Sequence, residues 1–286
     1  KNKKQKENSE QKEENDKEEL SESEKVQNIV RKAKENGKMT YGLFVVNSHS
    51  DSFYRIIVFF NHQLMMIKVC GMRDPENIRD VGKLGIDMMG FNFCKDDPRH
   101  VGMIASLAAI IPDYADRRLI AENNSPRRVG VFADDMPQNI VTAVYNYKLD
   151  CVQLQGSESP VMIDNLRRTL DPDICKGVRI FKTLNVANID DLISSRQYSA
   201  HADMLVFNMK SDDTEGARSC SDFELLDEYD GGLPFLVGGI VTEDLDGIKA
   251  VSNPCFAGGD LNEGFETKPG IKDTSKLKDF ISLLGK

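Results

Sequence analysis

The strongest constraint on the fold of this chain is a repeating pattern that begins at Met66 and continues to the C-terminus. Short runs of apolar and β-branched residues alternate with longer segments in which apolar residues recur at helical spacing. The predicted strands are Ile67–Cys70, Met88–Phe93, Arg128–Phe132, Cys151–Leu154, Val178–Lys182, Met204–Asn208, Pro234–Val237 and Phe256–Asp260. The predicted helices are Pro75–Leu84, Val101–Ile111, Pro137–Tyr147, Pro160–Leu170, Ile189–Ser194, Asp222–Tyr229, Glu243–Val251 and Thr274–Leu284.

Eight strand–helix units in about 220 residues have the size and rhythm of a (β/α)₈ barrel. Pro75 and Pro137 support two of the helix starts, because proline is favoured in a first helical turn. An open, doubly wound sheet is the alternative. No GxGxxG motif follows the first predicted strand, and this favours a closed barrel. The chain is therefore predicted to be an α/β protein with a TIM barrel over residues 65–286.

Residues 1–64 differ in composition from the predicted barrel. Residues 1–38 consist mainly of Lys, Glu, Asn, Gln and Ser, and their first large apolar residue is Leu20. Such a segment buries too little apolar surface to offset its conformational entropy, so a charged, disordered extension is expected. It is predicted to be partly helical around Leu20–Lys34. A docking arm is the alternative, but no motif supports it. Residues 39–64 contain two strand-like runs with no clear place in the barrel.

Charge and cysteine spacing exclude several classes of function. A net charge of −9 argues against a nucleic-acid partner, since phosphate binding needs clustered Lys and Arg. The six cysteines form no CxxC pair and the four histidines show no metal-ligand spacing, so no metal site is expected. Scattered cysteines are typical of a reducing cytoplasm. No signal peptide is recognised, and no apolar run is long enough to cross a membrane.

Polar and reactive residues gather at the carboxyl ends of the predicted strands. Functional groups of a (β/α)₈ barrel lie at this end and in the loops that follow it. Cys70 ends the first strand and Arg99 lies in the loop after the second. The others at this end are Pro98, Gln153, Gln155, Lys182, Asn208, Gly238, Gly239, Asp260, Asn262 and Gly264. Their shared position predicts a site at one rim of the barrel.

Two features of this rim suggest an anionic ligand. The segments "LVGGI" and "AGGDLNEGFE" place small residues where backbone N–H groups can approach a phosphate. The alternative is that the glycines only permit tight turns. The guanidinium of Arg99 matches the geometry of a carboxylate. The alternative for Arg99 is an ion pair with Asp96 or Asp97 at the surface.

Five sequence blocks resemble the phosphoribosylanthranilate isomerase family of tryptophan biosynthesis. They are "MIKVCGMRDPENIRDVGKLGIDMMGFNF", "DPRHV", "VGVFADDMPQNIVTAVYNYKLDCVQLQGSESP", "FLVGGI" and "DLNEGFETKPGIKD". The resemblance covers about residues 65–286. It implies an isomerase that converts N-(5-phosphoribosyl)anthranilate into 1-(2-carboxyphenylamino)-1-deoxyribulose 5-phosphate, without a metal or an organic cofactor. It also implies a small phosphorylated substrate, no nucleic-acid or membrane partner, and a monomer or homodimer in the cytoplasm.

The resemblance assigns roles to residues of the rim. It implies that Cys70 is the general base, which requires a thiol with a pKa near neutrality. It implies that Arg99 holds the anthranilate carboxylate, and that Gly238, Gly239 and the segment around Asn262 hold the phosphate. The substrate-binding set is then Arg99, Gln153, Gln155, Gly238, Gly239, Asp260 and Asn262.

Four departures from the family pattern bear on catalysis. The position of the family's general acid, an aspartate, is Asn208, and an amide does not deliver a proton near neutral pH. A glycine-rich loop is replaced by residues 215–218, which read "EGAR", and a histidine is replaced by Gln155. Glu263 and Gly264 stand where Ser followed by Arg or Gly is expected, and a carboxylate there would repel a phosphate unless it turns outward.

These departures leave alternatives open. Asp212 and Asp213 are candidate replacement acids in the loop after Asn208. Without a replacement, the chain would be a catalytically impaired barrel that binds a phosphorylated sugar or serves as an interaction platform. Another phosphosugar barrel of the same pathway, indole-glycerol-phosphate synthase, is disfavoured because its pattern of lysine and glutamate at the strand ends is absent.

Overall fold

The computed structural model describes residues 42–43, 56–57, 65–102, 125–209 and 223–285. The chain divides into two compact units, residues 1–61 and residues 62–286. In the first unit, β1 (Gly42–Leu43) pairs antiparallel with β2 (Ile56–Ile57). These short strands lie in the two strand-like runs seen in the sequence. The predicted charged tail, residues 1–38, lies outside the described residues.

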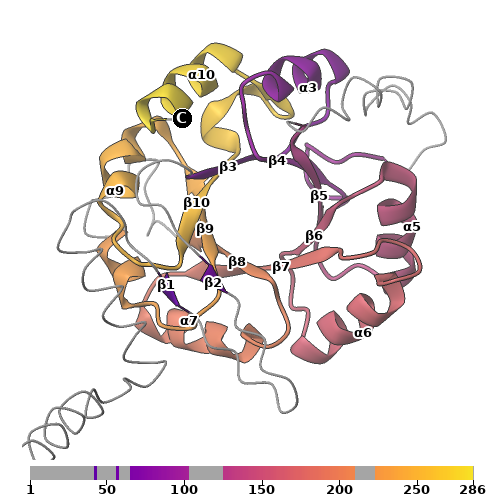
Figure 1. Cartoon of the computed structure of the whole chain (residues 1–286). Helices are drawn as coiled ribbons and strands as arrows, with labels where there is room; N and C mark the ends of the chain where they lie inside the picture. The colour runs from indigo at the N-terminus through magenta and orange to yellow at the C-terminus, as the bar shows by residue number, and fades with distance from the viewer. Residues whose placement is uncertain (1–41, 44–55, 58–64, 103–124, 210–222, 286) are drawn as a thin grey trace, which may run out of the picture. The chain divides into compact units, whose positions relative to one another are not determined.

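The second unit is a closed barrel of parallel strands, as Figure 1 shows. Its strands are β3 (Met66–Val69), β4 (Met88–Asn92), β5 (Arg127–Phe132), β6 (Cys151–Leu154), β7 (Arg179–Val186), β8 (Met204–Met209), β9 (Phe235–Ile240) and β10 (Phe256–Leu261). Each strand pairs with its neighbour in the sequence, and β10 pairs with β3 to close the ring, with Gly259 opposite Ile67. The predicted TIM barrel is confirmed.

Helices surround the barrel on its outer side (Figure 1). The α-helices that the structure describes over their whole length are α3 (Pro75–Gly82), α5 (Pro137–Tyr147), α6 (Pro160–Leu170), α7 (Ile189–Ser194), α9 (Leu245–Ala250) and α10 (Thr274–Leu283). Asp74 caps α3 by accepting a hydrogen bond from the Asn77 N–H at 2.9 Å, and proline follows it in the first turn. Among the described helices, none has the length and apolar character needed to cross a membrane.

Several predicted boundaries change in the structure. The helix predicted over 222–229 is helical at 223–224 and then tightens into the 3₁₀ turn Leu225–Glu228, while residue 222 lies outside the described residues. Strand β7 extends to Val186 and β9 to Ile240, because neighbouring strands continue to pair with these residues. Most of the helix predicted over 101–111 lies outside the described residues.

An unpredicted hairpin follows β10. Strand β11 (Glu266–Lys268) pairs antiparallel with β12 (Ile271–Lys272), and Gly270 at the turn has a φ of +83°, which favours glycine. Periodicity does not reveal such an element, because its strands are short and mainly polar.

The barrel interior changes from apolar to polar toward the carboxyl ends of the strands. The apolar layer consists of Met66, Met88, Val129, Cys151, Phe181, Met204, Val206, Leu236 and Ala257. Side chains alternate across a strand, so a residue two positions beyond a member of this layer also faces inward. These next residues include Lys68, Gln153 and Thr183, all of them polar and buried. A polar layer therefore lies directly above the apolar core.

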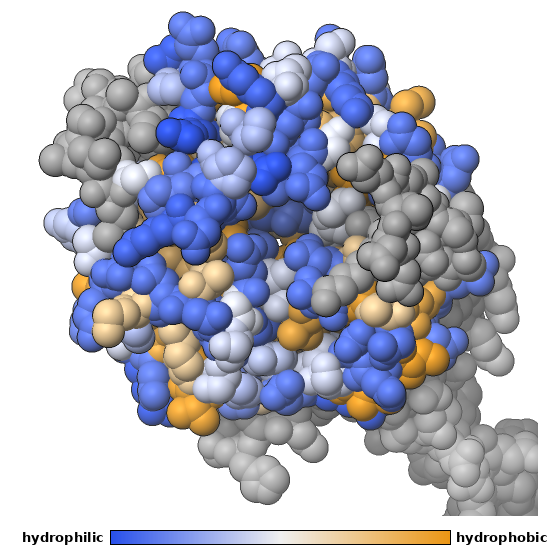
Figure 2. Space-filling model, turned by 180° about the vertical axis from the view of Figure 1, so that it is seen from behind, coloured by the Kyte–Doolittle hydropathy of each residue, from blue (hydrophilic) through white to orange (hydrophobic). Residues whose placement is uncertain are grey.

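Figure 2 shows the end of the barrel that carries this polar layer. The strands follow one another clockwise in Figure 1, and right-handed crossovers produce that order when a barrel is seen from its amino ends. Figure 2 looks from the opposite side, and so shows the carboxyl ends. A hollow lies at the centre of this face, and most of the coloured residues around it are hydrophilic.

Candidate active site

Cys70 lies at the exit of β3, where its N–H donates to the carbonyl of Leu261 on β10 at 2.8 Å. The thiol faces the barrel interior, on the same side as Lys68 two residues before it. Its sulfur lies against Gly90 of β4, where an added Cβ would approach it to 2.7 Å. The prediction that Cys70 lies at the rim agrees with this position, and Gly90 leaves the space that the thiol occupies.

A buried ion pair lies beneath the thiol. Lys68 Nζ donates to Asp260 Oδ2 at 2.6 Å, and the Lys68 side chain has no exposed surface. Burial raises the pKa of the Cys70 thiol, and the charges of Lys68 and Lys272 only partly oppose this effect. Burial lowers the pKa of Lys68, but the charge of Asp260 opposes this effect, and the pKa of Lys68 is raised. In the ligand-free protein, Cys70 is therefore a protonated thiol beside an ammonium group.

Two buried side-chain oxygen atoms at this end of the barrel accept no hydrogen bond from the described residues. They are Oδ1 of Asp260 and Oε1 of Gln153. The amide of Gln153 donates from Nε2 to the hydroxyl of Thr183 at 3.0 Å, which fixes its orientation. Buried acceptors without donors are costly, so both oxygens are suited to hydroxyl groups of a ligand or to water.

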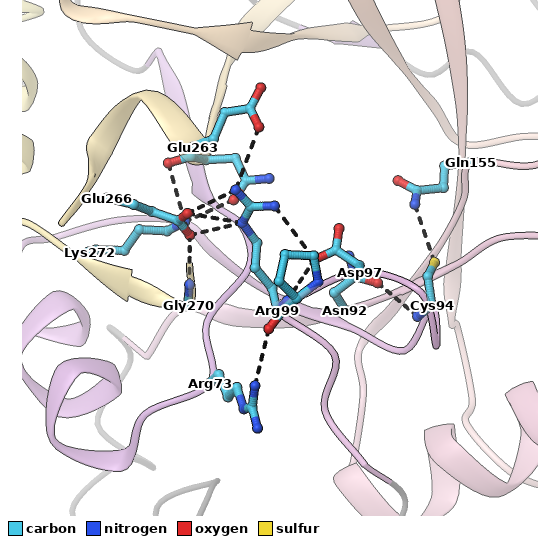
Figure 3. A network of polar contacts seen from close by, with 12 residues as sticks. Arg73, Asn92, Cys94, Asp97, Arg99, Gln155, Glu263, Glu266, Gly270 and Lys272 are labelled. Atoms are coloured by element: carbon cyan, nitrogen blue, oxygen red, sulfur yellow. Dashed lines mark hydrogen bonds and ion pairs between the residues drawn. The ribbon is translucent and has the colours of Figure 1, made fainter. Parts of the chain in front are cut away.

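Arg99 is held by a carboxylate that the sequence did not suggest. Glu266 of β11 receives hydrogen bonds from Arg99 Nε at 3.0 Å and from Nη2 at 2.9 Å (Figure 3). The predicted alternative partner Asp97 lies 3.5 Å from Nη1, and its side chain accepts the backbone N–H of Arg99 at 2.7 Å. The Arg99 side chain is 11% exposed. The Nε/Nη2 edge of the guanidinium is thus occupied.

Lys272 of β12 joins the same network. Its ammonium donates to Glu266 Oε1 at 2.5 Å, to Asn262 Oδ1 at 2.8 Å and to the Asn262 carbonyl at 3.2 Å. Burial lowers the pKa of Lys272, while Glu266 opposes that effect. An added Cβ on Gly71, whose φ is +72°, would lie 2.6 Å from both Arg99 Cδ and Asn262 Oδ1. Gly71 therefore lets the hairpin network pack against the exit of β3.

Asn208, Gly238 and Gly239 lie on neighbouring strands at the same end of the barrel. Asn208 is two residues beyond Val206 of the apolar layer, so it faces inward, and its Oδ1 packs directly against Gly238. The two glycines lie within β9 rather than after it, since the strand is longer than predicted. Gly264 approaches the end of β9 closely, because an added Cβ would lie 2.7 Å from the Ile240 carbonyl.

Glu263 turns outward, toward Arg99. Its side chain is 72% exposed, and its Oε2 lies 3.5 Å from Arg99 Nη2. The outward orientation is the one under which a carboxylate in this loop would not repel a phosphate.

Two other predicted rim residues take different positions. Lys182 was predicted to end the fifth strand, but β7 continues to Val186. Lys182 lies on the outer face of β7, between inward-facing Phe181 and Thr183, and it pairs with Glu158 at 3.0 Å. Gln155 follows β6 and donates from Nε2 to the Cys94 sulfur at 3.2 Å. Asp212, Asp213 and residues 215–218 lie outside the described residues.

The functional candidates that sequence reasoning missed are Lys68, Glu266 and Lys272. Lys68 had a signal, because a lysine inside an apolar strand needs a buried partner. No sequence signal pointed to Glu266 or Lys272, because Glu266 and its partner Arg99 are 167 residues apart in the chain. Within the described part of the chain, no three His, Cys, Asp or Glu side chains are placed to hold a metal ion.

Residues 67–283 match the family model of N-(5'-phosphoribosyl)anthranilate (PRA) isomerase. A relative from Parabacteroides distasonis named N-(5'-phosphoribosyl)anthranilate isomerase is 36% identical over 218 residues, which are 76% of this chain and 92% of the relative. One of the same name from Phocaeicola vulgatus is 32% identical over 77% of this chain and 98% of its own. The crystal structure of phosphoribosyl anthranilate isomerase from Thermotoga maritima shares the fold, with a TM-score of 0.61 and 24% identity over 78% of this chain and 99% of that chain.

Proposed function

Because this chain belongs to the N-(5'-phosphoribosyl)anthranilate isomerase family, we propose that it catalyses the Amadori rearrangement of N-(5-phosphoribosyl)anthranilate. The product is 1-(2-carboxyphenylamino)-1-deoxyribulose 5-phosphate, and the reaction is an aldose–ketose isomerisation that uses no cofactor. The observation that carries this proposal is the family match across the whole barrel. We place the reaction in the cytoplasm, in a protein that acts as a monomer or homodimer.

The reaction needs one acid and one base. An acid protonates the ribose ring oxygen, and the C1–O bond breaks as the amine nitrogen forms a Schiff base. Cys70 must first lose its thiol proton to solvent, and the resulting thiolate then takes the C2 proton. The C–H electron pair forms the C1–C2 double bond of an enamine, and the Schiff-base π pair returns to the nitrogen. The enamine tautomerises to the ketone. Lys68 stabilises the thiolate form of Cys70 through its positive charge.

The carboxylate, the hydroxyls and the phosphate of the substrate each match different residues of the rim. The Nη1/Nη2 edge of Arg99 receives the anthranilate carboxylate, because Glu266 occupies the other edge. The unpaired oxygens of Gln153 and Asp260 accept sugar hydroxyls. Gly238, Gly239 and the segment around Asn262 receive the phosphate through backbone N–H groups. Gln155 lies at the exposed side of the site.

The general acid must come from a residue other than Asn208. Asn208 cannot supply a proton near neutral pH, so we propose that Asp212 or Asp213 replaces it. A catalytically impaired barrel that binds a phosphorylated sugar, or an interaction platform, is the second candidate, and Asn208 is the observation that favours it. Losing a general acid lowers rates by about 10²–10⁴-fold, so slow turnover would persist even in that case.

The rate of turnover, compared with that of Asn208→Asp, distinguishes the two candidates, because an impaired barrel should gain about 10²–10⁴-fold from the restored carboxyl group and a working isomerase should not. Purified protein is mixed with N-(5-phosphoribosyl)anthranilate, and loss of substrate fluorescence is followed with time. An isomerase consumes the substrate at a rate that falls when Cys70 is replaced by Ser. Replacing Asp212 and Asp213 together by Asn tests the replacement acid, because full activity in that double variant would exclude both residues.

A further inference from the structure

The free edge of the Arg99 guanidinium is flanked by two carboxylates that do not bind it closely. Asp97 lies 3.5 Å from Nη1 and Glu263 lies 3.5 Å from Nη2 (Figure 3). Both distances exceed those of charge-assisted hydrogen bonds, which are about 2.7–2.9 Å. The opposite edge makes such short bonds with Glu266. Arg99 is therefore satisfied on one edge and only loosely partnered on the other.

Of these three carboxylates, Glu263 is the one that is free to move. Glu266 is fixed by Arg99, by Lys272 and by the N–H of Gly270 at 3.1 Å, and its side chain is 6% exposed. Asp97 is tethered by the backbone N–H of Arg99. The Glu263 side chain is 72% exposed, and its recorded polar contact among the described residues is the distant one with Arg99.

We propose that Glu263 is a specificity-determining residue that competes with an incoming carboxylate for the Nη1/Nη2 edge of Arg99. This rests on the proposed function, in which that edge receives the aryl carboxylate of the substrate. A ligand carboxylate must displace Glu263 or bind next to its negative charge. Glu263 therefore lowers the affinity of the site for carboxylates. The effect comes from the charge of one exposed side chain and requires no change in the backbone of the site.

The test measures binding of free anthranilate, through its own fluorescence, to the full chain and to two variants. Glu263→Gln keeps the size of the side chain and removes its charge. We expect anthranilate affinity to rise by about two- to five-fold, the effect of one exposed ion pair. The gain should shrink as salt is added, because exposed charges are screened. Glu228→Gln is the control, because it makes the same change in charge at an exposed position of the 3₁₀ turn Leu225–Glu228.

A third variant ties the gain to Arg99. In Arg99→Met, the added change Glu263→Gln should produce no gain, because the group for which Glu263 competes is absent. Equal affinity of the wild type and Glu263→Gln, or a gain of the same size in Glu228→Gln, would overturn the proposal. Failure of all proteins to bind anthranilate would overturn it too.

The outcomes also separate this proposal from the proposed function. A gain in anthranilate affinity without any turnover of the phosphoribosyl substrate would support the role of Glu263 and count against isomerase activity. Turnover of the substrate, with the same anthranilate affinity in the wild type and Glu263→Gln, would support isomerase activity and count against the role of Glu263.

Discussion

The ionisation of Cys70 is the residue-scale property on which the proposed mechanism depends. Burial raises the pKa of this thiol, so the thiolate fraction in the ligand-free protein should rise only as pH rises above the usual thiol range. We expect alkylation of Cys70 by iodoacetamide to accelerate steadily with pH, followed by mass spectrometry of the Cys70 peptide. Lys68→Met should slow it further at each pH, since the opposing positive charge is lost. A rate independent of pH across the neutral range would contradict this prediction.

Asn208→Asp places a carboxyl group at the position where the resemblance to the family predicts the general acid. The two side chains have the same shape, so the contact with Gly238 should persist. If the missing acid limits the rate, turnover should rise by about 10²–10⁴-fold, the usual contribution of general acid catalysis. The measurement is kcat/KM for both proteins, with their urea midpoints compared to exclude a folding effect. An unchanged kcat/KM would mean that another group already supplies the proton.

Single residues of the site differ in how well the sequence predicts them. Cys70 and Arg99 stand in short motifs next to recognisable strands, and both lie at the rim in the structure. The alternative partner for Arg99 within the chain was Asp96 or Asp97. Asp97 does lie 3.5 Å away, but the close partner is Glu266. Local spacing favours neighbours in sequence, but a closed barrel places the loop after its last strand beside the first strand. Such contacts follow from closure and not from spacing.

At the scale of elements, one buried ion pair fastens the loop after β6 to β7. Lys182 and Glu158 have 1% and 3% of their side chains exposed, and Lys182 also donates to the carbonyls of Gly156 and Leu154. Glu158→Ala leaves the ammonium buried without its counter-charge. We expect the free energy of unfolding, measured by urea denaturation, to fall by about 3–5 kcal/mol.

The control for this prediction is Lys83→Ala. Lys83 pairs with Asp80, and both side chains are mostly exposed, so its loss should leave the urea midpoint nearly unchanged. A small effect of Glu158→Ala, similar to that of Lys83→Ala, would show that water or a rearranged carbonyl replaces the carboxylate.

The elements that the sequence predicted best are those with strong periodicity. Helices over 137–147 and 160–170 agree with the structure at both ends, because proline marks their starts and apolar spacing marks their length. Strands β7 and β9 were predicted too short, because polar residues (Thr183, Asn185) or glycines (Gly238, Gly239) interrupt their apolar runs, while pairing with neighbouring strands continues beyond them. The β11–β12 hairpin was missed for a related reason. Its charged residues form strands because Glu266 and Lys272 gain buried partners.

At the scale of the whole molecule, the closure of the strands and the polar layer explain why one end of the barrel is suited to bind a ligand and catalyse a reaction. The apolar layer, at the level of Met66 and Phe181, supplies stability. In the polar layer above it, one oxygen each of Gln153 and Asp260 has no partner within the described protein. The apolar layer of the strands therefore stabilises the barrel, and the polar layer that follows it along the same strands is available for binding.

All eight strands of the ring come from residues 66–261, and β1 and β2 form a separate two-stranded sheet. A chain of residues 62–286 therefore retains every strand pairing of the barrel. We expect this shortened protein to keep the urea midpoint and the anthranilate affinity of the full chain, because neither depends on pairing with the first unit. Circular dichroism and the fluorescence titration measure the two properties. A lower midpoint, or weaker binding with an unchanged midpoint, would show that residues 1–61 contribute to the barrel or to its site.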